Sequence, residues 1–156
     1  MFKLSWIAVA VLVLDQWTKW LAVTHLTRGA IEVLPFFNLT LAYNSGAAFG
    51  FLSGASGWQN FFFVIVALVV AIVILFMIKR LGANDVQVAV ALMLILGGAA
   101  GNVIDRLVLG YVVDFIDLYY GSWHFWTFNI ADAAITVGAI LLVLDSFGLG
   151  FRKRHR

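Results

Sequence analysis

The stretch WQNFFFVIVALVVAIVILFMI, residues 58–78, has no charged side chain in 21 consecutive positions. As an α-helix it would be about 32 Å long, which matches the roughly 30 Å hydrocarbon core of a bilayer. Three more apolar segments of similar length occur at residues 4–23, 86–104 and 128–147. The sequence therefore predicts four membrane-spanning helices.

The composition agrees with this prediction. Hydrophobic residues make up 63% of the 156 positions, charged residues only 12%, and the mean hydropathy is +1.01. Such a chain has too few polar groups to cover a surface that faces water. We expect an all-α integral membrane protein, in which residues 1–156 form a single membrane-embedded domain. We also expect it to be a monomer.

Composition also excludes several kinds of site. The chain has no cysteine, which removes disulfides, thiolate metal sites and cysteine nucleophiles. Its three histidines, His25, His124 and His155, are too scattered for two imidazoles to share one helix face, so we expect no metal centre. The net charge is only +2 and basic residues cluster at the C-terminus, which favours anionic membrane lipids over nucleic acid as partners.

Basic residues predict the orientation, because they stay on the cytoplasmic side of membrane spans. With four spans both termini share one side, and that side has seven lysines and arginines: Lys3, Lys79, Arg80, Arg152, Lys153, Arg154 and Arg156. The opposite side has two, Arg28 and Arg106. We therefore expect cytoplasmic termini and outward-facing connections at residues 24–57 and 105–127.

The outer connections are predicted to be structured. Residues 31–43 and 112–120 are rich in β-branched and aromatic side chains, which indicates a small extended or β element. We expect a short helix in these connections as well.

Ionisable residues inside the apolar segments are candidate functional residues. Asp15 and Lys19 lie four apart, which is a favourable order for an ion pair on one helix face. A structural pair and a substrate-binding role are equally compatible with this spacing. Asp132 follows Asn129 by three residues at the outer start of the fourth segment, and an aspartate is too short to reach far out of the membrane, so we favour a function for it.

Two glycine-containing motifs add further candidates. Residues 97–106 read GGAAGNVIDR, in which the glycines allow close helix packing and Asn102, Asp105 and Arg106 project near the outer end. Asn44 begins a run of small residues, 44–50, that would let backbone approach a ligand or another helix. A simple polar helix end and ordinary helix packing are the alternatives.

A pair of aspartates lies in the extended segment VVDFID, residues 112–117. In a strand, the spacing of three puts Asp114 and Asp117 on opposite faces. We expect only one of them to point inward, and the spacing does not say which.

Carboxylates, asparagines and an arginine, without paired histidine or cysteine, are typical of two chemistries. One is proton or cation translocation through a carboxylate relay, and the other is aspartyl hydrolysis, in which two close carboxylates share a proton. The residues alone leave both open. The polar residues gather at the outer face instead of forming a chain across the bilayer, which favours a surface-accessible enzyme.

Five motifs in this order resemble the lipoprotein signal peptidases (signal peptidase II), a bacterial family of intramembrane aspartyl peptidases with four spans. The motifs are LDQWTK at 14–19, NSGAAF at 44–49, GGAAGNVIDR at 97–106, VVDFID at 112–117 and FNIADAAI at 128–135. The resemblance implies cleavage of signal peptides from diacylglyceryl-modified prolipoproteins, just before the lipidated cysteine, at the outer face of the inner membrane.

The resemblance also implies roles for individual residues. Asp114 and Asp132 would be the catalytic pair. The residues that would line or support the site are Asp15, Lys19, Asn44, Gly98, Asn102, Arg106 and Asn129. No metal or organic cofactor would be needed, because two aspartates can both activate water and polarise a carbonyl.

Overall fold

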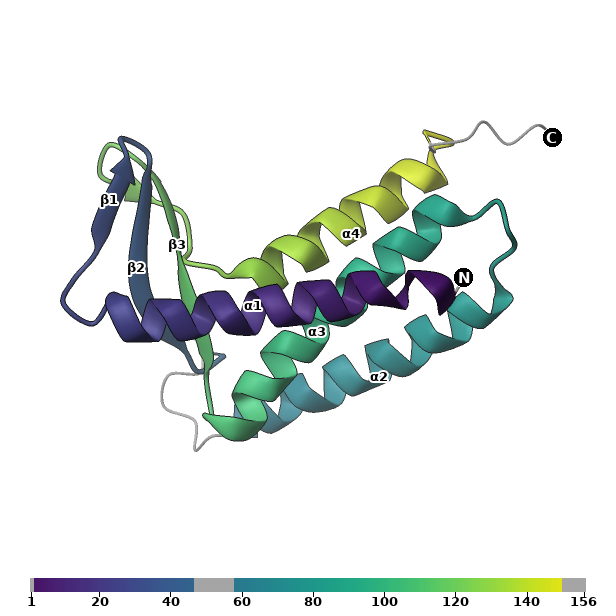
Figure 1. Ribbon diagram of the computed structural model, residues 1–156, viewed down its shortest axis with the longest axis horizontal. Coiled ribbons are helices and arrows are strands. Elements are labelled where there is room, and N and C mark those ends of the chain that lie inside the picture. The colour runs from purple at the N-terminus through teal and green to yellow at the C-terminus, as the bar shows by residue number, and fades with distance from the viewer. Residues whose placement is uncertain (1, 47–57, 150–156) are drawn as a thin grey trace.

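The structure is a computed structural model that describes residues 2–46 and 58–149 (Figure 1). It contains four long helices, α1 (Ser5–His25), α2 (Trp58–Arg80), α3 (Val86–Val108) and α4 (Ile130–Ser146), and a short 3-10 helix, η1 (Phe2–Leu4), that precedes α1. Four strands, β1 (Ile31–Leu34), β2 (Phe37–Asn44), β3 (Val112–Tyr120) and β4 (Trp123–His124), form one antiparallel sheet in the order β1-β2-β3-β4.

The helices match the predicted apolar segments, and α3 packs against each of the other three. Three of them, α1, α2 and α3, are long and apolar enough to cross a membrane. Helix α4 has 17 residues, or about 26 Å, and its role as a fourth span stays a prediction. The large apolar side chains on α2 are mostly exposed in the isolated chain, Phe61 and Ile72 among them, as lipid-facing residues would be.

The predicted β element is confirmed, and it lies at one end of the helices. Figure 1 shows the sheet at one end, whereas the start of α1, the connection between α2 and α3 and the end of α4 lie at the other. The short helix predicted for the outer connections does not occur in their described residues, which form strands and turns. Residues 47–50 of the small-residue run and the basic residues of the C-terminal tail lie outside the described residues.

Two small apolar clusters hold this arrangement together. One, built on Ile74, Ile78, Leu92 and Met93, joins α2 to α3 near the end that carries the start of α1. The other, built on Ala22, Leu26 and Phe115, joins the last turns of α1 to β3. The second cluster fixes the sheet against α1, and so positions the strand that carries Asp114.

Candidate active site

The start of α4 is joined to β3 by main-chain hydrogen bonds. Phe128 N donates to Ile116 O at 3.0 Å, and Phe128 O accepts from Ile116 N at 2.9 Å. This bridge lies two residues from Asp114 on β3 and one residue before Asn129, which caps α4. The bridge therefore brings the two aspartate-containing motifs of the sequence to one place.

Asp114 is buried, with 2% of its surface exposed, and its carboxylate accepts two amide hydrogen bonds. Asn129 Nδ2 donates to its Oδ1 at 2.6 Å, and Asn44 Nδ2 donates to its Oδ2 at 3.1 Å. Burial and, to a smaller extent, the nearby charge of Asp132 raise the pKa of Asp114 to about 6, against the opposing effect of the two amide hydrogen bonds. Asp114 is thus a carboxyl group that keeps its proton up to about pH 6, well above the ordinary range of an aspartate.

Asp132 lies in the first turn of α4 and is half-buried. Its Oδ1 accepts a hydrogen bond from Asn102 Nδ2 at 2.7 Å, and its backbone N–H donates to Asn129 Oδ1 at 2.9 Å. Asn129 therefore contacts both aspartates, since its oxygen caps the helix that carries Asp132 and its nitrogen binds Asp114.

The amide of Asn102 is oriented by its own neighbours. Its Oδ1 accepts hydrogen bonds from Lys19 Nζ at 3.1 Å and from Asn129 Nδ2 at 3.2 Å. Two donors on the oxygen leave the nitrogen to face Asp132. Lys19 thus acts on Asp132 through one intervening side chain.

A buried charge network lies behind these residues. Lys19 Nζ is 2.8 Å from both Asp15 Oδ2 and Asp105 Oδ2, and all three side chains are almost fully enclosed. Asp15 Oδ1 also accepts from Ala131 N at 2.9 Å, so it holds the first turn of α4. The predicted ion pair is present, and its enclosed position favours the structural alternative over contact with a substrate.

Gln16 is absent from the candidates of the sequence analysis, and the place of Asp105 in this network was not predicted. Asp105 Oδ2 accepts from Val113 N at 3.1 Å, next to Asp114, and Asp105 Oδ1 accepts from Gln16 Nε2 at 2.9 Å. The sequence analysis grouped Asp105 with Arg106 at a helix end. Its spacing of three from Asn102 puts both residues on one face of α3, and that spacing was the available signal.

Arg106 lies on the same turn, with a different environment. Its Nη1 donates to Asn102 O at 3.2 Å, and its guanidinium lies 5.0 Å from the centre of the Phe63 ring. Its charge interacts with those of Asp114 and Asp132, while its buried Nε has no hydrogen-bond partner among the described residues. A donor is therefore available close to the two aspartates.

Gly98 lies at the contact between α3 and α4 instead of beside the carboxylates. A Cβ at this position would collide with the Ala131 carbonyl oxygen and would lie 2.9 Å from Ile135 Cγ1. The glycine thus lets α3 approach the first turn of α4. This turn contains Asp132, which accepts a hydrogen bond from Asn102 on α3.

Asp117 lies on the opposite face of β3 from Asp114, as the spacing predicts. Its carboxylate is 2.9 Å from His124 Nδ1, and Asn38 Nδ2 donates to it at 3.4 Å. We expected only one of the two aspartates to point inward. This was wrong, because Asp117 is also buried, beside His124 and Asn38. Of the two aspartates of β3, only Asp114 is hydrogen-bonded to Asn129, which also accepts from the backbone N–H of Asp132.

The arrangement can perform acid–base chemistry. It offers a protonatable, buried carboxyl group, a second carboxylate that is partly open, and a nearby cationic donor. Within residues 2–46 and 58–149, no three histidine, aspartate or glutamate side chains group as a metal site would require.

Known proteins place the chain in a family. The family model described as signal peptidase (SPase) II matches residues 7–148. A lipoprotein signal peptidase of Acinetobacter baumannii is 56% identical over 150 residues, which cover 94% of this chain and 85% of the relative. Another, from Alteromonas mediterranea, is 48% identical over 152 residues, covering 97% and 84%.

Two solved structures are similar across nearly their whole lengths, and each is described as a bacterial membrane enzyme. One has a TM-score of 0.80 at 36% identity and covers 94% of this chain and 93% of its own. The other has a TM-score of 0.79 at 34% identity and covers 100% and 94%. The sequence comparisons therefore show the family, and the fold is shared with bacterial membrane enzymes.

Proposed function

This chain belongs to the signal peptidase II family, and we propose that it removes signal peptides from diacylglyceryl-modified prolipoproteins, just before the lipidated cysteine. It is an aspartic endopeptidase that processes lipoproteins. The family assignment removes ion translocation, the other chemistry compatible with the carboxylates, from consideration. The substrate detail and the residue roles below are our proposal.

Asp114 and Asp132 form the catalytic pair in this proposal. Asp132, which is the more open carboxylate, takes a proton from water, and the resulting hydroxide attacks the scissile carbonyl carbon. Asp114, in the protonated form that its raised pKa of about 6 favours, donates its proton to the carbonyl oxygen. As the tetrahedral intermediate collapses, Asp114 takes back a proton from a hydroxyl of that intermediate, the C–N bond breaks, and the proton held by Asp132 passes to the leaving amine.

The observation that carries this proposal is the position of Asn129. One amide binds Asp114 and caps the turn that holds Asp132, which keeps both carboxylates in one arrangement before substrate arrives. Each carboxylate also accepts a hydrogen bond from a second asparagine: Asp114 from Asn44, and Asp132 from Asn102. We assign to Arg106 Nε, a buried donor, a hydrogen bond to a substrate carbonyl.

The remaining predicted residues support the site from farther away. Asp15 and Lys19 hold α4 and Asn102 from α1, and Gly98 sets the distance between α3 and α4. None of these three would contact the reacting atoms.

The location of the site suits a substrate anchored in a bilayer. We place both termini in the cytoplasm, and the sheet and the aspartates near the periplasmic face of the bacterial inner membrane. A lipidated precursor is held by an apolar signal helix and two acyl chains, so its cleavage site is confined to this depth. We retain the prediction of a monomer in contact with membrane lipids.

The test is incubation of the purified protein with a lipidated prolipoprotein and with the same precursor lacking the diacylglyceryl group, followed by mass measurement of the products. We expect cleavage before the modified cysteine, with much slower cleavage of the unlipidated precursor because it forgoes about 0.8 kcal/mol for each buried CH₂. Equal rates under the same detergent conditions would contradict the proposed substrate class.

A further inference from the structure

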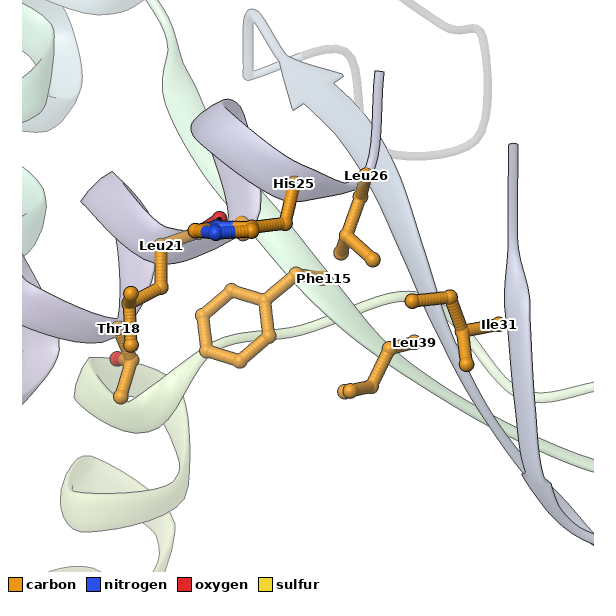
Figure 2. A pocket seen from close by; sticks show the side chains of 8 residues that line it. Thr18, Leu21, His25, Leu26, Ile31, Leu39 and Phe115 are labelled. Carbon is orange, nitrogen blue, oxygen red and sulfur yellow. Dashed lines mark hydrogen bonds between the residues drawn. The ribbon is translucent and has the colours of Figure 1, made fainter. Parts of the chain in front are cut away.

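A cavity of about 370 Å³ lies between the last turns of α1 and the sheet, apart from the aspartates (Figure 2). Helix α1 contributes Thr18, Leu21 and His25, and the strands contribute Ile31, Leu39 and Phe115. Figure 2 shows the Phe115 ring between the α1 side chains and Leu39. We propose that this cavity is a binding site for one acyl chain of a resident membrane phospholipid.

The chemistry of the wall selects an apolar occupant. The two side chains with polar atoms already use them on the backbone of α1. Thr18 Oγ1 donates to Leu14 O at 2.7 Å, and His25 Nδ1 is hydrogen-bonded to Leu21 O at 3.0 Å. The rest of the named wall is aliphatic or aromatic, so an occupant gains little from polar groups and most from buried hydrocarbon.

The cavity lies beside a part of α1 that lipid chains would surround. Helix α1 is long and apolar enough to cross a membrane, and Thr18–His25 forms the last two turns of that span. Trp17 and Trp20, in the same part of the helix, are exposed, as residues at a lipid interface are. The part of α1 that lines the cavity therefore also carries side chains suited to a lipid interface.

A basic residue that could meet a phospholipid headgroup follows the α1 part of the cavity wall in the sequence. Arg28 follows Leu26, a residue of the cavity wall, by two positions, and it lies exposed in the turn that leaves α1. An exposed guanidinium at headgroup level attracts a phosphate.

The face of β3 separates this cavity from the substrate. Phe115 and Asp114 are neighbours in a strand, so their side chains point to opposite faces. A diacylglyceryl cysteine beside the scissile bond must lie on the Asp114 side, which leaves the Phe115 side to a lipid of the bilayer. The occupied cavity would also support Phe115, and through it the strand that carries Asp114.

This exclusion of the substrate rests on the proposed function and on the catalytic role of Asp114, so the test uses lipid cross-linking, and not cleavage, as its primary readout. The full-length protein is reconstituted in vesicles that contain phosphatidylglycerol with a photoreactive diazirine near the end of one acyl chain. After illumination, cross-linked peptides are located by mass spectrometry. We expect cross-links on the strand peptides that contain Leu39 or Phe115, which lie outside the helices.

Two variants fill the cavity from opposite walls, Leu39→Trp and Leu21→Trp. Each should reduce the strand cross-links at least about tenfold, because an indole side chain takes the volume that the acyl chain would occupy and a tenfold loss of occupancy corresponds to only ~1.4 kcal/mol. Leu68→Trp on α2 is the matched control, since Leu68 is 52% exposed and distant in sequence from the cavity wall. Arg28→Gln should reduce the cross-links by a smaller factor, about threefold, as expected for an exposed ionic contact.

Circular dichroism and thermal unfolding in the same vesicles identify the variants that fold. Cross-links confined to the helices in the wild-type protein would overturn the proposal. So would strand cross-links that persist in both folded cavity variants. A higher KM for the lipidated precursor with unchanged phospholipid cross-linking would assign the cavity to a substrate chain and overturn the proposal as well.

Discussion

Single asparagine side chains determine how the two aspartates are held. An amide offers both a donor and an acceptor, so Asn129 binds Asp114 with its nitrogen and the Asp132 backbone with its oxygen. Asn102 uses its oxygen for Lys19 and its nitrogen for Asp132. No charged residue could take these positions without changing the protonation of the pair, because a new charge would favour one state.

The first prediction concerns the carboxylates themselves. Asp114→Asn and Asp132→Asn should each abolish cleavage while the protein still folds and inserts, because an amide keeps the shape but neither accepts a proton from water nor shares one. Asp117→Asn should be milder, since Asp117 lies on the other face of β3 with His124. Rates on purified, folded variants decide this, and near-normal turnover by either of the first two would identify the wrong pair.

A second prediction follows from the raised pKa of Asp114, about 6 against an ordinary value of 3.8. The folded protein holds this proton more tightly than the unfolded chain, so the stabilisation is complete below the ordinary value and is lost as pH rises through about 6. The loss corresponds to at most about 3 kcal/mol, at ~1.4 kcal/mol per pKa unit. The thermal unfolding temperature should therefore fall as the pH is raised from about 3.8 to above 6.

The Asp114→Asn variant provides the comparison for that experiment. It has no proton to lose, so its stability should change less with pH over the same range. Asp145→Asn, at the far end of α4, should keep the wild-type slope. An unchanged slope in Asp114→Asn would show that another group titrates there.

At the scale of elements, the site depends on how closely α3, α4 and β3 approach one another. Gly98 allows the contact between α3 and α4, and the Phe128–Ile116 bridge joins α4 to β3. Asp105 then joins α3 to β3 through Val113 N. Each joint lies within a few residues of an aspartate, so a small displacement of one element would separate the pair.

Gly98→Ala tests the contact between α3 and α4. The added Cβ would meet the Ala131 carbonyl, a backbone atom that cannot turn away, so we expect a loss of about 1–3 kcal/mol of stability. Cleavage should slow as well, because Asp132 would move away from Asn102. Gly82→Ala is the control, since its Cβ would meet only Asp85 Oδ2 at 3.5 Å. Equal stability of the two variants would contradict a close contact.

Asp105→Asn tests the joint between α3 and β3. The carboxylate accepts from Lys19, Gln16 and Val113, and an amide would present hydrogens to at least one of these donors. An unsatisfied buried donor costs about 1–3 kcal/mol, so unfolding should begin at lower temperature. We also expect kcat to fall more than KM rises, because Asp114 is displaced while the substrate surface is kept. Wild-type kinetics would remove Asp105 from the supporting network.

The whole molecule places the sheet at one end of the helices, opposite the start of α1 and the end of α4 (Figure 1). Asp114 lies on β3 of this sheet, and many large apolar side chains of the helices are exposed in the isolated chain. A bilayer around the helices would therefore leave the aspartates at one interface, where water and an anchored substrate can both reach them.

The prediction at this scale is that both termini are cytoplasmic. Seven basic residues on that side against two on the other favour this orientation. Fusions of a periplasm-active reporter to either terminus should be inactive, and a fusion in the connection between β4 and α4 should be active. A periplasmic terminus would reverse the topology and place the site on the wrong side of the membrane for this function.

Local features of the sequence determined the class of the protein and the extent of its helices. The apolar stretch at residues 58–78 became Trp58–Arg80, and the one at 128–147 became Ile130–Ser146, because hydropathy is a property of consecutive residues. The β element was predictable because enrichment in β-branched and aromatic residues is likewise a property of consecutive residues. The motifs named the candidate aspartates before any fold was known.

Only the tertiary structure decided which polar residues meet. The period of a strand separates Asp114 from Asp117, but the side on which α4 packs decides that Asp114 shares Asn129 with Asp132. The pairing of Lys19 with Asp105, residues far apart in the chain, was likewise missed because no local pattern encodes it. Buried charges take the partners that the packed helices bring within reach, and that packing is a property of the entire chain.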